Sequence, residues 1–400
     1  MNRSIRLFLA VLLVSLMMAP GIYSQRLSRA KPEEVGMSSA HLSFINTIVG
    51  EAIDRKDFPG AVVLVGRKGR IIFRQAFGQS QWIPTPRPMD VSMIFDLASV
   101  TKPVATATSI MILAEQGRLR LWDKVKDFVP EFSPYIEEGG NPGEDARVWH
   151  LLTHTSGLPP YTDAKEVAQK YGDPCPTETL VQHIAGLKKN NPAGKAFAYS
   201  CLGYITMGHI VKKLTGRTIA EFAAESIFRP LKMEHTFYNP PDAYRDLCVP
   251  TQVTDGQPLV GVVHDPLARL QGGISGNAGL FSTADDLAVF AQMMLNKGIF
   301  EAVRILSPLT VERMTAVYPN TEFAGRGLGW DLHSGFATVG GDIYGPNAYG
   351  HSGYTGTSIW IDPDTQTFVI FLTNRVHPDD KGDIISMRSK LANVVASSIR

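Results

Sequence analysis

Two segments near opposite ends of the chain have the pattern of paired β-strands. In residues 60–78, GAVVLVGRKGRIIFRQAFG, apolar residues stand on both sides of Lys68-Gly69, which predicts two strands joined by a tight turn. Residues 358–375, SIWIDPDTQTFVIFLTNR, repeat this form with a Pro-Asp turn between the strands. Between these ends, helical periodicity predicts helices at 100–117, around 177–189, at 202–216 and at 283–298.

The predicted helix at 283–298 carries the residue types expected at helix ends. Thr283 can cap its first turn, and Asp285 and Asp286 suit the positive end of the helix dipole. Gly298 is expected to terminate it. Strands at both chain ends with helices between them predict an α/β (α+β) fold, in which one antiparallel sheet is assembled from the two chain ends.

The first residues of the chain have the composition of an export signal. Arg3 and Arg6 precede an apolar run from Leu7 to Met18, and small and helix-breaking residues follow. We therefore expect a signal peptide over residues 1–25 and an exported protein, periplasmic or secreted. The run is short for a membrane span, so an uncleaved anchor is the lesser alternative. No stable membrane partner is expected beyond export.

The composition is that of a globular protein and excludes some partners. A chain of 400 residues with 44% hydrophobic and 19% charged residues can bury a large core, as one composite domain or two lobes. The formal net charge is +1 and no long basic run is present, so no nucleic-acid partner is expected. The chain is expected to be a monomer.

Cysteine and histidine spacing gives no sign of a metal centre. Three cysteines, Cys175, Cys201 and Cys248, allow at most one disulfide, and their spacing matches no metal site. No H-E-x-x-H stretch is present, and His264-Asp265 has no obvious third ligand, so this pair is interpreted as structural or as a contact at the rim of the site. Neither a metal nor an organic cofactor is expected.

The segment FDLASVTKPVATATSIMIL (95–113) places a serine and a lysine about one helical turn apart on an apolar face. Taken alone, the structural interpretation is favoured: Ser99 caps the helix and Lys102 reaches toward water. The chemical interpretation is that Lys102 activates Ser99 as a nucleophile. Apolar surroundings would then be expected to lower the pKa of Lys102, so that it takes the proton.

Two further stretches carry chemistry of the same kind. Tyr199-Ser200-Cys201 offers a tyrosine that a nearby ammonium can turn into a base. His351-Ser352-Gly353 precedes the C-terminal strands, where a glycine-flanked strand allows close approach of a substrate and offers N–H donors to an oxyanion. Each also has a structural interpretation, as a packed aromatic residue and as a glycine-rich turn with a solvent-facing histidine.

Together the three motifs resemble the active-site serine family that unites penicillin-binding proteins with serine β-lactamases. The Y-x-N and H-x-G forms are similar to its class C β-lactamase branch, with the esterase and D-amino-acid peptidase relatives. The resemblance covers roughly residues 35–395. Further stretches typical of this branch are LLTHTSGLPPY (151–161), GNAGLFSTADDLAVF (276–290) and GHSGYTG (350–356).

This resemblance implies the β-lactamase/transpeptidase-like fold and acyl transfer through a serine ester. The hydrolase domain would span 26–400, with an α/β lobe at about 35–114 and 271–400, a mostly helical lobe at about 115–270, and the site between them. The enzyme would cleave an amide or ester carbonyl of a small-molecule or peptide substrate: a β-lactam, a D-Ala peptide or an ester.

The resemblance also assigns roles to individual residues. Ser99 would be the acylated nucleophile, Lys102 its proton partner, and Tyr199 the base that protonates the leaving group. Backbone N–H groups of Ser99 and Tyr354 would form the oxyanion hole. The residues expected to contact substrate are Cys201, His351, Ser352, Gly353 and Arg375.

Two positions depart from the family pattern. Cys201 replaces the asparagine of Y-x-N, and a thiol is a weak substitute for an amide. His351 replaces the lysine of K-T-G, and a mostly neutral histidine holds a substrate carboxylate less well, which favours esterase or peptidase activity over a dedicated β-lactamase. We hypothesise that Arg375 supplies the missing cation as a carboxylate clamp.

Other functions remain as alternatives. A conventional α/β-hydrolase needs the motif G-x-S-x-G. The most similar stretch here is GHSGY (350–354), in which Tyr354 stands where the motif has its last glycine. A non-catalytic penicillin-binding-like protein is favoured by Cys201 but opposed by the presence of Ser99, Lys102 and Tyr199. A carboxylesterase without β-lactamase activity is a further alternative.

Overall fold

The structure is a computed structural model that describes residues 27–335 and 340–400. The expected signal peptide at 1–25 therefore lies outside the described residues. Across the two described ranges, no helix combines the length and the apolar character that crossing a membrane requires.

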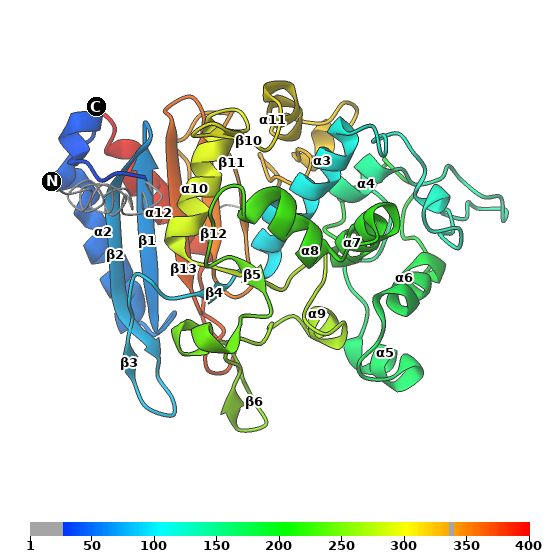
Figure 1. Cartoon of the computed structure of the whole chain (residues 1–400), viewed down its shortest axis with the longest axis horizontal. Coiled ribbons are helices and arrows are strands. Elements are labelled where there is room, and N and C mark those ends of the chain that lie inside the picture. Colours follow the sequence, from blue (N-terminus) through cyan, green and yellow to red (C-terminus); the bar gives the residue numbers. More distant parts are fainter. Residues whose placement is uncertain (1–26, 336–339) are drawn as a thin grey trace, which may run out of the picture.

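Six strands of the described chain form one antiparallel sheet, in the order β11-β12-β13-β1-β2-β3. The central contact joins β1 to β13, which pair from Ala61 with Thr373 to Arg67 with Thr367. Blue N-terminal strands thus lie beside orange C-terminal strands, which confirms the prediction of a sheet built from both chain ends (Figure 1). The strands are β1 (Gly60–Arg67), β2 (Arg70–Gln81), β3 (Arg87–Pro88), β11 (Tyr349–Ser352), β12 (Ser358–Asp362) and β13 (Thr367–Thr373).

The predicted turn between the first two long strands is confirmed. Lys68 and Gly69 have φ angles of 47° and 76°, so both adopt the left-handed conformation that a two-residue hairpin of type I′ requires. Glycine adopts this conformation without the steric cost that a Cβ imposes.

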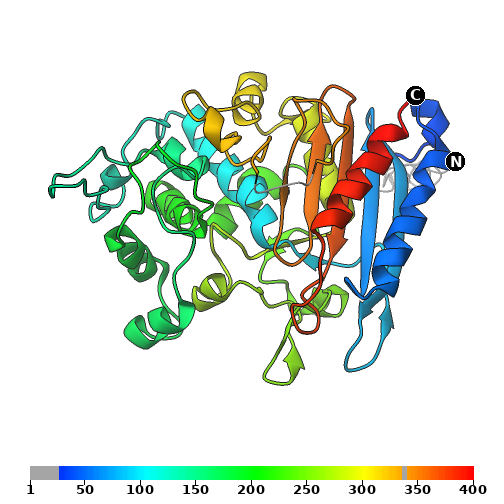
Figure 2. The same ribbon diagram turned by 180° about the vertical axis from the view of Figure 1, so that it is seen from behind.

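Helices cover both faces of the sheet, and β1 shows how the sequence makes this possible. Val62 and Leu64 belong to the large core on the α10 side, whereas Val63 and Val65 belong to a second core. Because alternate side chains of a strand point to opposite faces, an unbroken apolar strand is buried on both sides. Figures 1 and 2 show α10 (Ala284–Leu295) on one face, and α2 (Phe44–Asp54) with α12 (Ile385–Ser397) on the other.

The remaining helices lie mostly on the α10 side of the sheet (Figure 1). All of α4 to α9 fall within residues 148–270, whereas the large sheet comes entirely from residues outside that range. The helices, some only one turn long, are α1 (Ser39–Leu42), α3 (Thr108–Glu115), α4 (Val148–Leu152), α5 (Ala164–Tyr171), α6 (Thr177–Gly186), α7 (Cys201–Thr215), α8 (Ile219–Ala223), α9 (Pro266–Leu270) and α11 (Pro308–Met314).

Short elements connect these layers. A small antiparallel sheet joins β4 (Phe95–Asp96), β8 (Leu280–Ser282) and β5 (Phe237–Tyr238) in that order. Two short hairpins pair β6 (Val253–Thr254) with β7 (Gln257–Pro258), and β9 (Ile299–Phe300) with β10 (Val303–Arg304). The 3-10 turns are η1 (Pro32–Val35), η2 (Ala98–Val100), η4 (Val125–Asp127), η6 (Asp242–Leu247) and η7 (Glu322–Ala324), and the π-helical segments are η3 (Lys102–Ala107) and η5 (Ala224–Phe228).

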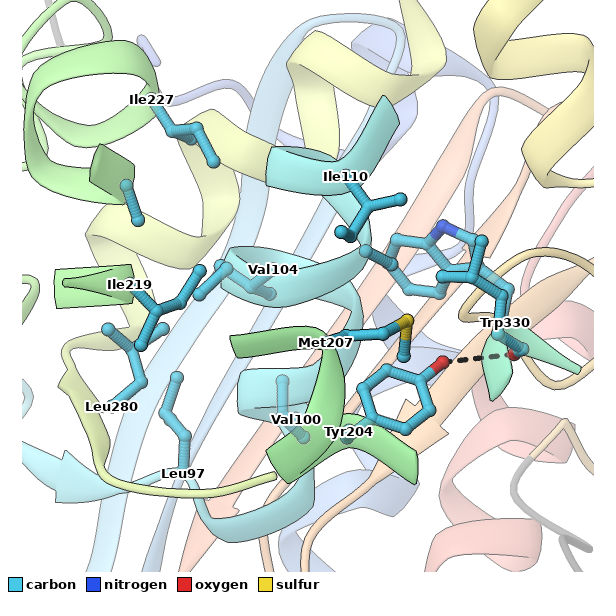
Figure 3. Packing of buried hydrophobic residues seen from close by; sticks show 14 of the residues in the cluster. Leu97, Val100, Val104, Ile110, Tyr204, Met207, Ile219, Ile227, Leu280 and Trp330 are labelled. Atoms are coloured by element: carbon cyan, nitrogen blue, oxygen red, sulfur yellow. Dashed lines mark hydrogen bonds between the residues drawn. The ribbon is translucent and has the colours of Figure 1, made fainter. Parts of the chain in front are cut away.

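The helical segment formed by η3 and α3 lies between the sheet and the other helices, and its residues 102–113 are all buried. Val104 and Ile110 are fully buried and pack among side chains from α7 and α8, such as Met207 and Ile219 (Figure 3). Burying a side chain of this size stabilises the fold by about 1.5–3 kcal/mol. The apolar face noted in the sequence is therefore a core face, and it fixes the position of the residues at the start of this helix.

The four predicted helices are present with changed boundaries. The segment predicted at 100–117 is divided into a 3-10 turn, a π-helix and α3, and the segment at 177–189 ends at Gly186. Thr283 does cap α10, but Gly298 is not its C-cap: Asn296 takes that position, and Gly298 follows with a φ of 94° as the chain turns away. All three cysteines are free.

Candidate active site

Ser99 lies in a tight turn at the end of β4. The preceding Ala98 has a φ of 45°, in the left-handed region that residues with a Cβ rarely adopt, and Ser99 is the central residue of η2. Lys102 begins η3 and is fully buried, and its Nζ lies 2.8 Å from Ser99 Oγ. The structure thus brings together the serine and lysine that the sequence spacing predicted.

Side-chain hydrogen bonds accompany the π-helical geometry after Lys102. Pro103 has no backbone N–H to donate, and the Thr108 hydroxyl donates to the Pro103 carbonyl at 2.8 Å. The Thr106 hydroxyl points out of the helix and donates to the Gly276 carbonyl at 2.7 Å. These side chains satisfy carbonyls that the widened helix and the neighbouring segment leave open. Such π segments are frequent at functional sites.

Lys102 has several hydrogen-bond acceptors around its ammonium group. Besides Ser99 Oγ, they include the Asn277 backbone carbonyl at 2.9 Å and the Cys201 Sγ at 3.5 Å, and Tyr199 also hydrogen-bonds this lysine. Burial lowers the pKa of Lys102, but negative charge on Cys201 or Tyr199 favours the ammonium, and the net shift of the pKa is upward. The expectation of a lowered lysine pKa is therefore wrong, because the approach of these groups outweighs desolvation. Lys102 is an ammonium that donates to Ser99.

Tyr199 lies beside this pair, directly before α7. Its ring centroid is 5.2 Å from Lys102 Nζ and 5.4 Å from the Arg326 guanidinium carbon. The His154 ring stacks on it at 4.3 Å with an interplanar angle of 29°. The phenol ring thus lies close to two buried cations, Lys102 and Arg326.

Two buried histidines near Tyr199 are neutral. His154 Nδ1 accepts the Ser200 N–H at 3.0 Å, so its proton is on Nε2, whereas His351 shares its Nδ1 proton with the Ser352 carbonyl at 2.9 Å. Burial, followed by the Arg326 and Lys102 charges, holds the pKa of both histidines well below the usual value. His351 is 2% exposed, which excludes a solvent-facing histidine.

The loop after β11 is tied to the turn that carries the serine. A Cβ on Gly353 would lie 2.4 Å from the Leu97 carbonyl oxygen, so the close approach requires glycine here. This glycine therefore makes room for the chain just before Ser99, in addition to any room it leaves for substrate. The Thr357 hydroxyl donates to the same Leu97 carbonyl at 2.9 Å.

Arg375 contacts the loop residue that is expected to form the oxyanion hole. Its Nε donates to the Tyr354 carbonyl at 2.8 Å, and its guanidinium lies 4.4 Å from the Tyr354 ring centroid. Its Nη1 pairs with Asp380 at 2.8 Å, and the Tyr354 hydroxyl donates to the same carboxylate at 2.7 Å. The Arg375 charge is therefore already paired, and a carboxylate clamp would require Asp380 to release it.

Both side chains of the pair His264-Asp265 make contacts that hold the fold. Asp265 caps α9 by accepting the Ala268 N–H at 2.8 Å, and His264 Nε2 lies 3.1 Å from the Gln252 side-chain oxygen. Within residues 27–335 and 340–400, no three side chains of the types that bind metals gather as a potential metal site.

The structure adds residues to the site that sequence reasoning did not select. Arg388 of α12 is buried and donates to the carbonyls of Gly353 and Thr357 at 2.7 and 2.9 Å. Arg326 forms an ion pair at 2.9 Å with Asp331, and both side chains are 2% exposed. His154 and Asn277 could have been selected from the sequence, because both lie in stretches that are typical of the resembled family. Arg326 and Arg388 lie outside those stretches.

A family model described as Beta-lactamase matches residues 45–392, so the chain belongs to this family of active-site serine proteins. It is 34% identical over 348 residues to an N-acetylmuramyl-L-alanine amidase of Bacillus subtilis, covering 80% of this chain and 78% of that protein. It is 29% identical over 398 residues to a putative D-alanyl-D-alanine carboxypeptidase of Escherichia coli, covering 93% and 90%.

Solved structures support the fold assignment. The hydrolase EstCE1, which has promiscuous acyltransferase activity, superimposes with a TM-score of 0.72 at 23% identity, covering 90% of this chain and 100% of that chain. The predicted β-lactamase/transpeptidase-like fold is confirmed, and the α/β-hydrolase alternative is excluded. The protein is a serine hydrolase of the β-lactamase family.

Proposed function

We propose that this chain is an exported serine hydrolase that cleaves an amide bond at an alanine residue of a bacterial cell-wall peptide, through an acyl-enzyme on Ser99. The contact of 2.8 Å between Ser99 Oγ and Lys102 Nζ carries the proposal. The names of the Bacillus subtilis and Escherichia coli relatives both describe amide cleavage at alanine, which supports this substrate class.

The first half of the reaction forms the ester. Tyr199 takes the Ser99 proton as Ser99 Oγ attacks the substrate carbonyl, and the Lys102 ammonium stabilises the negative charge shared between the two oxygens. The backbone N–H groups of Ser99 and Tyr354 receive the oxyanion. Tyr199 then gives its proton to the leaving amine, and the acyl group stays on Ser99.

The second half repeats this chemistry with water. Tyr199 takes a proton from the attacking water and returns it to Ser99 Oγ as the ester breaks. Lys102 remains an ammonium throughout, because the acceptors around it hold the charge in place. Burial raises the pKa of the Cys201 thiol, so Cys201 accepts weakly from Lys102 and offers little to a substrate amide.

A second candidate is ester hydrolysis. His351 is neutral and the Arg375 charge is paired with Asp380, so neither residue offers a free cation to a substrate carboxylate. Neutral esters need no such cation. The same absence counts against any substrate that carries a carboxylate next to the scissile bond, a β-lactam and a D-Ala-D-Ala peptide alike, and so favours the N-acetylmuramyl-L-alanine amide among the proposed substrates.

Product analysis of wild type and Ser99→Ala tests the proposal. We expect wild type to release an alanine-containing product from an N-acetylmuramyl-L-alanine peptide or a D-Ala-D-Ala peptide, and Ser99→Ala to release none. Hydrolysis of p-nitrophenyl acetate without release from either amide would support the esterase candidate instead. Amide cleavage that survives in Ser99→Ala would refute the mechanism. Sequencing the mature N-terminus tests export.

A further inference from the structure

Asp96 is a buried carboxylate three residues before the nucleophile. It is the last residue of β4 and 2% exposed. Its Oδ1 accepts the Ala98 N–H at 2.9 Å, and its Oδ2 accepts the His264 N–H at 2.7 Å. Both carboxylate oxygens are thus used to hold backbone groups, and one of these groups belongs to the turn of Ser99.

The bond to Ala98 supports a strained backbone. Ala98 has a φ of 45°, which turns the chain so that Ser99 follows as the central residue of η2. A residue with a Cβ holds this conformation only where its surroundings compensate for the cost. A charge-assisted hydrogen bond to the Ala98 N–H provides that compensation.

Asp96 also contacts the segment that carries the second oxyanion donor. Its backbone carbonyl accepts the Thr355 hydroxyl at 2.8 Å, and Thr355 follows Tyr354 directly. The His264 ring, whose backbone N–H Asp96 binds, stacks on the Tyr354 ring at 5.6 Å and 22°. Contacts of one buried residue therefore reach both chain segments that supply N–H groups to the oxyanion.

We propose that Asp96 is a positioning residue, whose carboxylate holds the turn that presents the Ser99 N–H and, through His264, the ring that stacks on Tyr354, and thereby sets the rate of acyl transfer. The inference rests on the proposed acylation of Ser99. Asp96 acts through its neighbours, because its carboxylate is enclosed and accepts from two backbone groups. Substrate binding is expected to depend on it little.

The charge state of Asp96 gives the proposal a measurable signature. Burial raises the pKa of Asp96 to about 6, although the hydrogen bonds from His264 and Ala98 oppose this. The charges that face it are Asp265, which raises the pKa further, and Arg269, which lowers it. The Cys248 thiol, which also faces Asp96, has a pKa of about 12 and stays neutral.

The direction of the pH effect follows from the raised pKa. As the pH falls through about 6, Asp96 becomes protonated, and one of its two acceptor positions becomes an O–H group beside a backbone N–H. The turn loses its support and the rate falls. The native state binds this proton more tightly than the unfolded chain does, so protonation of Asp96 does not itself unfold the protein.

The test compares pH profiles of wild type, Asp96→Asn and a matched control, with p-nitrophenyl acetate as the probe. The control is Asp362→Asn, since Asp362 is also buried and accepts backbone N–H groups of Asp364 and Thr365, but in the β12–β13 turn. We expect the wild-type kcat to fall by about tenfold as the pH is lowered through 6 and then to level off, with KM nearly constant. The control variant Asp362→Asn is expected to show the same decline of kcat as wild type.

Asp96→Asn is expected to lose about tenfold or more in kcat at pH 7.5 and to lack the decline near pH 6. An unchanged kcat, or the same decline as wild type, overturns the proposal. If Asp96→Asn does not fold, the test relies on the pH dependence of kcat in the wild-type protein. A decline of kcat near pH 6, measured where the protein is folded, supports the proposal, and the absence of this decline overturns it. Ser99→Ala separates the two proposals, because activity in that variant refutes the proposed function instead.

Discussion

Lys102 donates from a fully buried ammonium to Ser99 Oγ at 2.8 Å. The lysine is held in this state by acceptors from two other segments, the Asn277 carbonyl and the Cys201 thiol. In the proposed mechanism, proton transfer therefore belongs to Tyr199 and electrostatic stabilisation to Lys102.

Replacing this lysine is expected to remove most of the activity. In Lys102→Met, the charge shared by Ser99 and Tyr199 loses its stabilising cation, and we expect kcat to fall by a factor of about 10² to 10⁴. Steady-state hydrolysis of p-nitrophenyl acetate measures this loss.

Lys189 provides the matched control for that substitution. It is a second buried lysine, 3% exposed, whose Nζ donates to the carbonyls of Ala185 and Leu187. Lys189→Met should lower stability and leave kcat near the wild-type value. Comparable losses of kcat in both lysine variants would mean that Lys102 matters for folding alone.

Cys201→Asn should improve acylation by amide substrates. An asparagine offers an oxygen to the Lys102 ammonium and N–H donors to the substrate amide, whereas the thiol lies 3.5 Å from Lys102 Nζ and accepts weakly. We expect about a tenfold faster formation of the covalent adduct with a penicillin. Stopped-time mass spectrometry gives the rate.

Cys201→Ala is the comparison for this gain, because it removes the thiol without adding an amide. It should acylate no faster than wild type. Equal rates for the asparagine and alanine variants would show that residue 201 has no part in substrate positioning.

Arg375→Ala distinguishes holding a loop from binding a carboxylate. Because Arg375 donates to the Tyr354 carbonyl, its loss should loosen the oxyanion loop and lower kcat for acidic and neutral esters alike, by about tenfold. Matched esters with and without a carboxylate, measured for kcat and KM, provide the check. A rise in KM confined to the acidic ester would support the carboxylate clamp instead.

The stability of the protein should fall in acid, in part through His150. Burial, followed by the nearby Arg147 charge, lowers the pKa of His150 to about 3, and its Nδ1 accepts the Arg147 N–H at 2.8 Å. Below about pH 6.5 this histidine is therefore protonated in the unfolded chain but stays neutral in the native state. Because the unfolded state binds the extra proton, the free energy of unfolding declines as the pH falls from about 6.5 toward 3.

Urea unfolding of wild type and His150→Gln at two pH values measures this contribution. Between pH 7.5 and 5, one such histidine accounts for about 2 kcal/mol of lost stability, so the variant should show a correspondingly smaller decline. An identical decline in both proteins would mean that His150 titrates alike in the folded and unfolded chain.

The sequence predicted what depends on local pattern. The strands β1 and β13 were visible because central strands are apolar on both faces, and the Ser99–Lys102 contact followed from their spacing. The π-helical geometry was not visible, since six consecutive buried residues have no periodicity that separates it from an α-helix. The direction of the pKa shift of Lys102 was predicted wrongly because it depends on Cys201 and Tyr199, two residues far along the chain.

Asp96 illustrates the same limit. It stands in the stretch that opens the serine motif, yet its role depends on His264, which is 168 positions away. The pKa of Asp96 is raised mainly by burial, and burial of a carboxylate cannot be inferred from its neighbours in sequence. Roles for Tyr199 and His351 came from the family resemblance, because nothing local identifies either residue as part of a site.

Mapping the acylated residue tests the central claim most directly. Wild type, incubated with an N-acetylmuramyl-L-alanine peptide, a D-Ala-D-Ala peptide or a penicillin, is quenched in acid, digested and examined by mass spectrometry. We predict an acyl group on Ser99 in the peptide that contains residues 95–102, and no adduct in Ser99→Ala. An adduct on another residue, or turnover of an amide substrate by Ser99→Ala, would contradict the account.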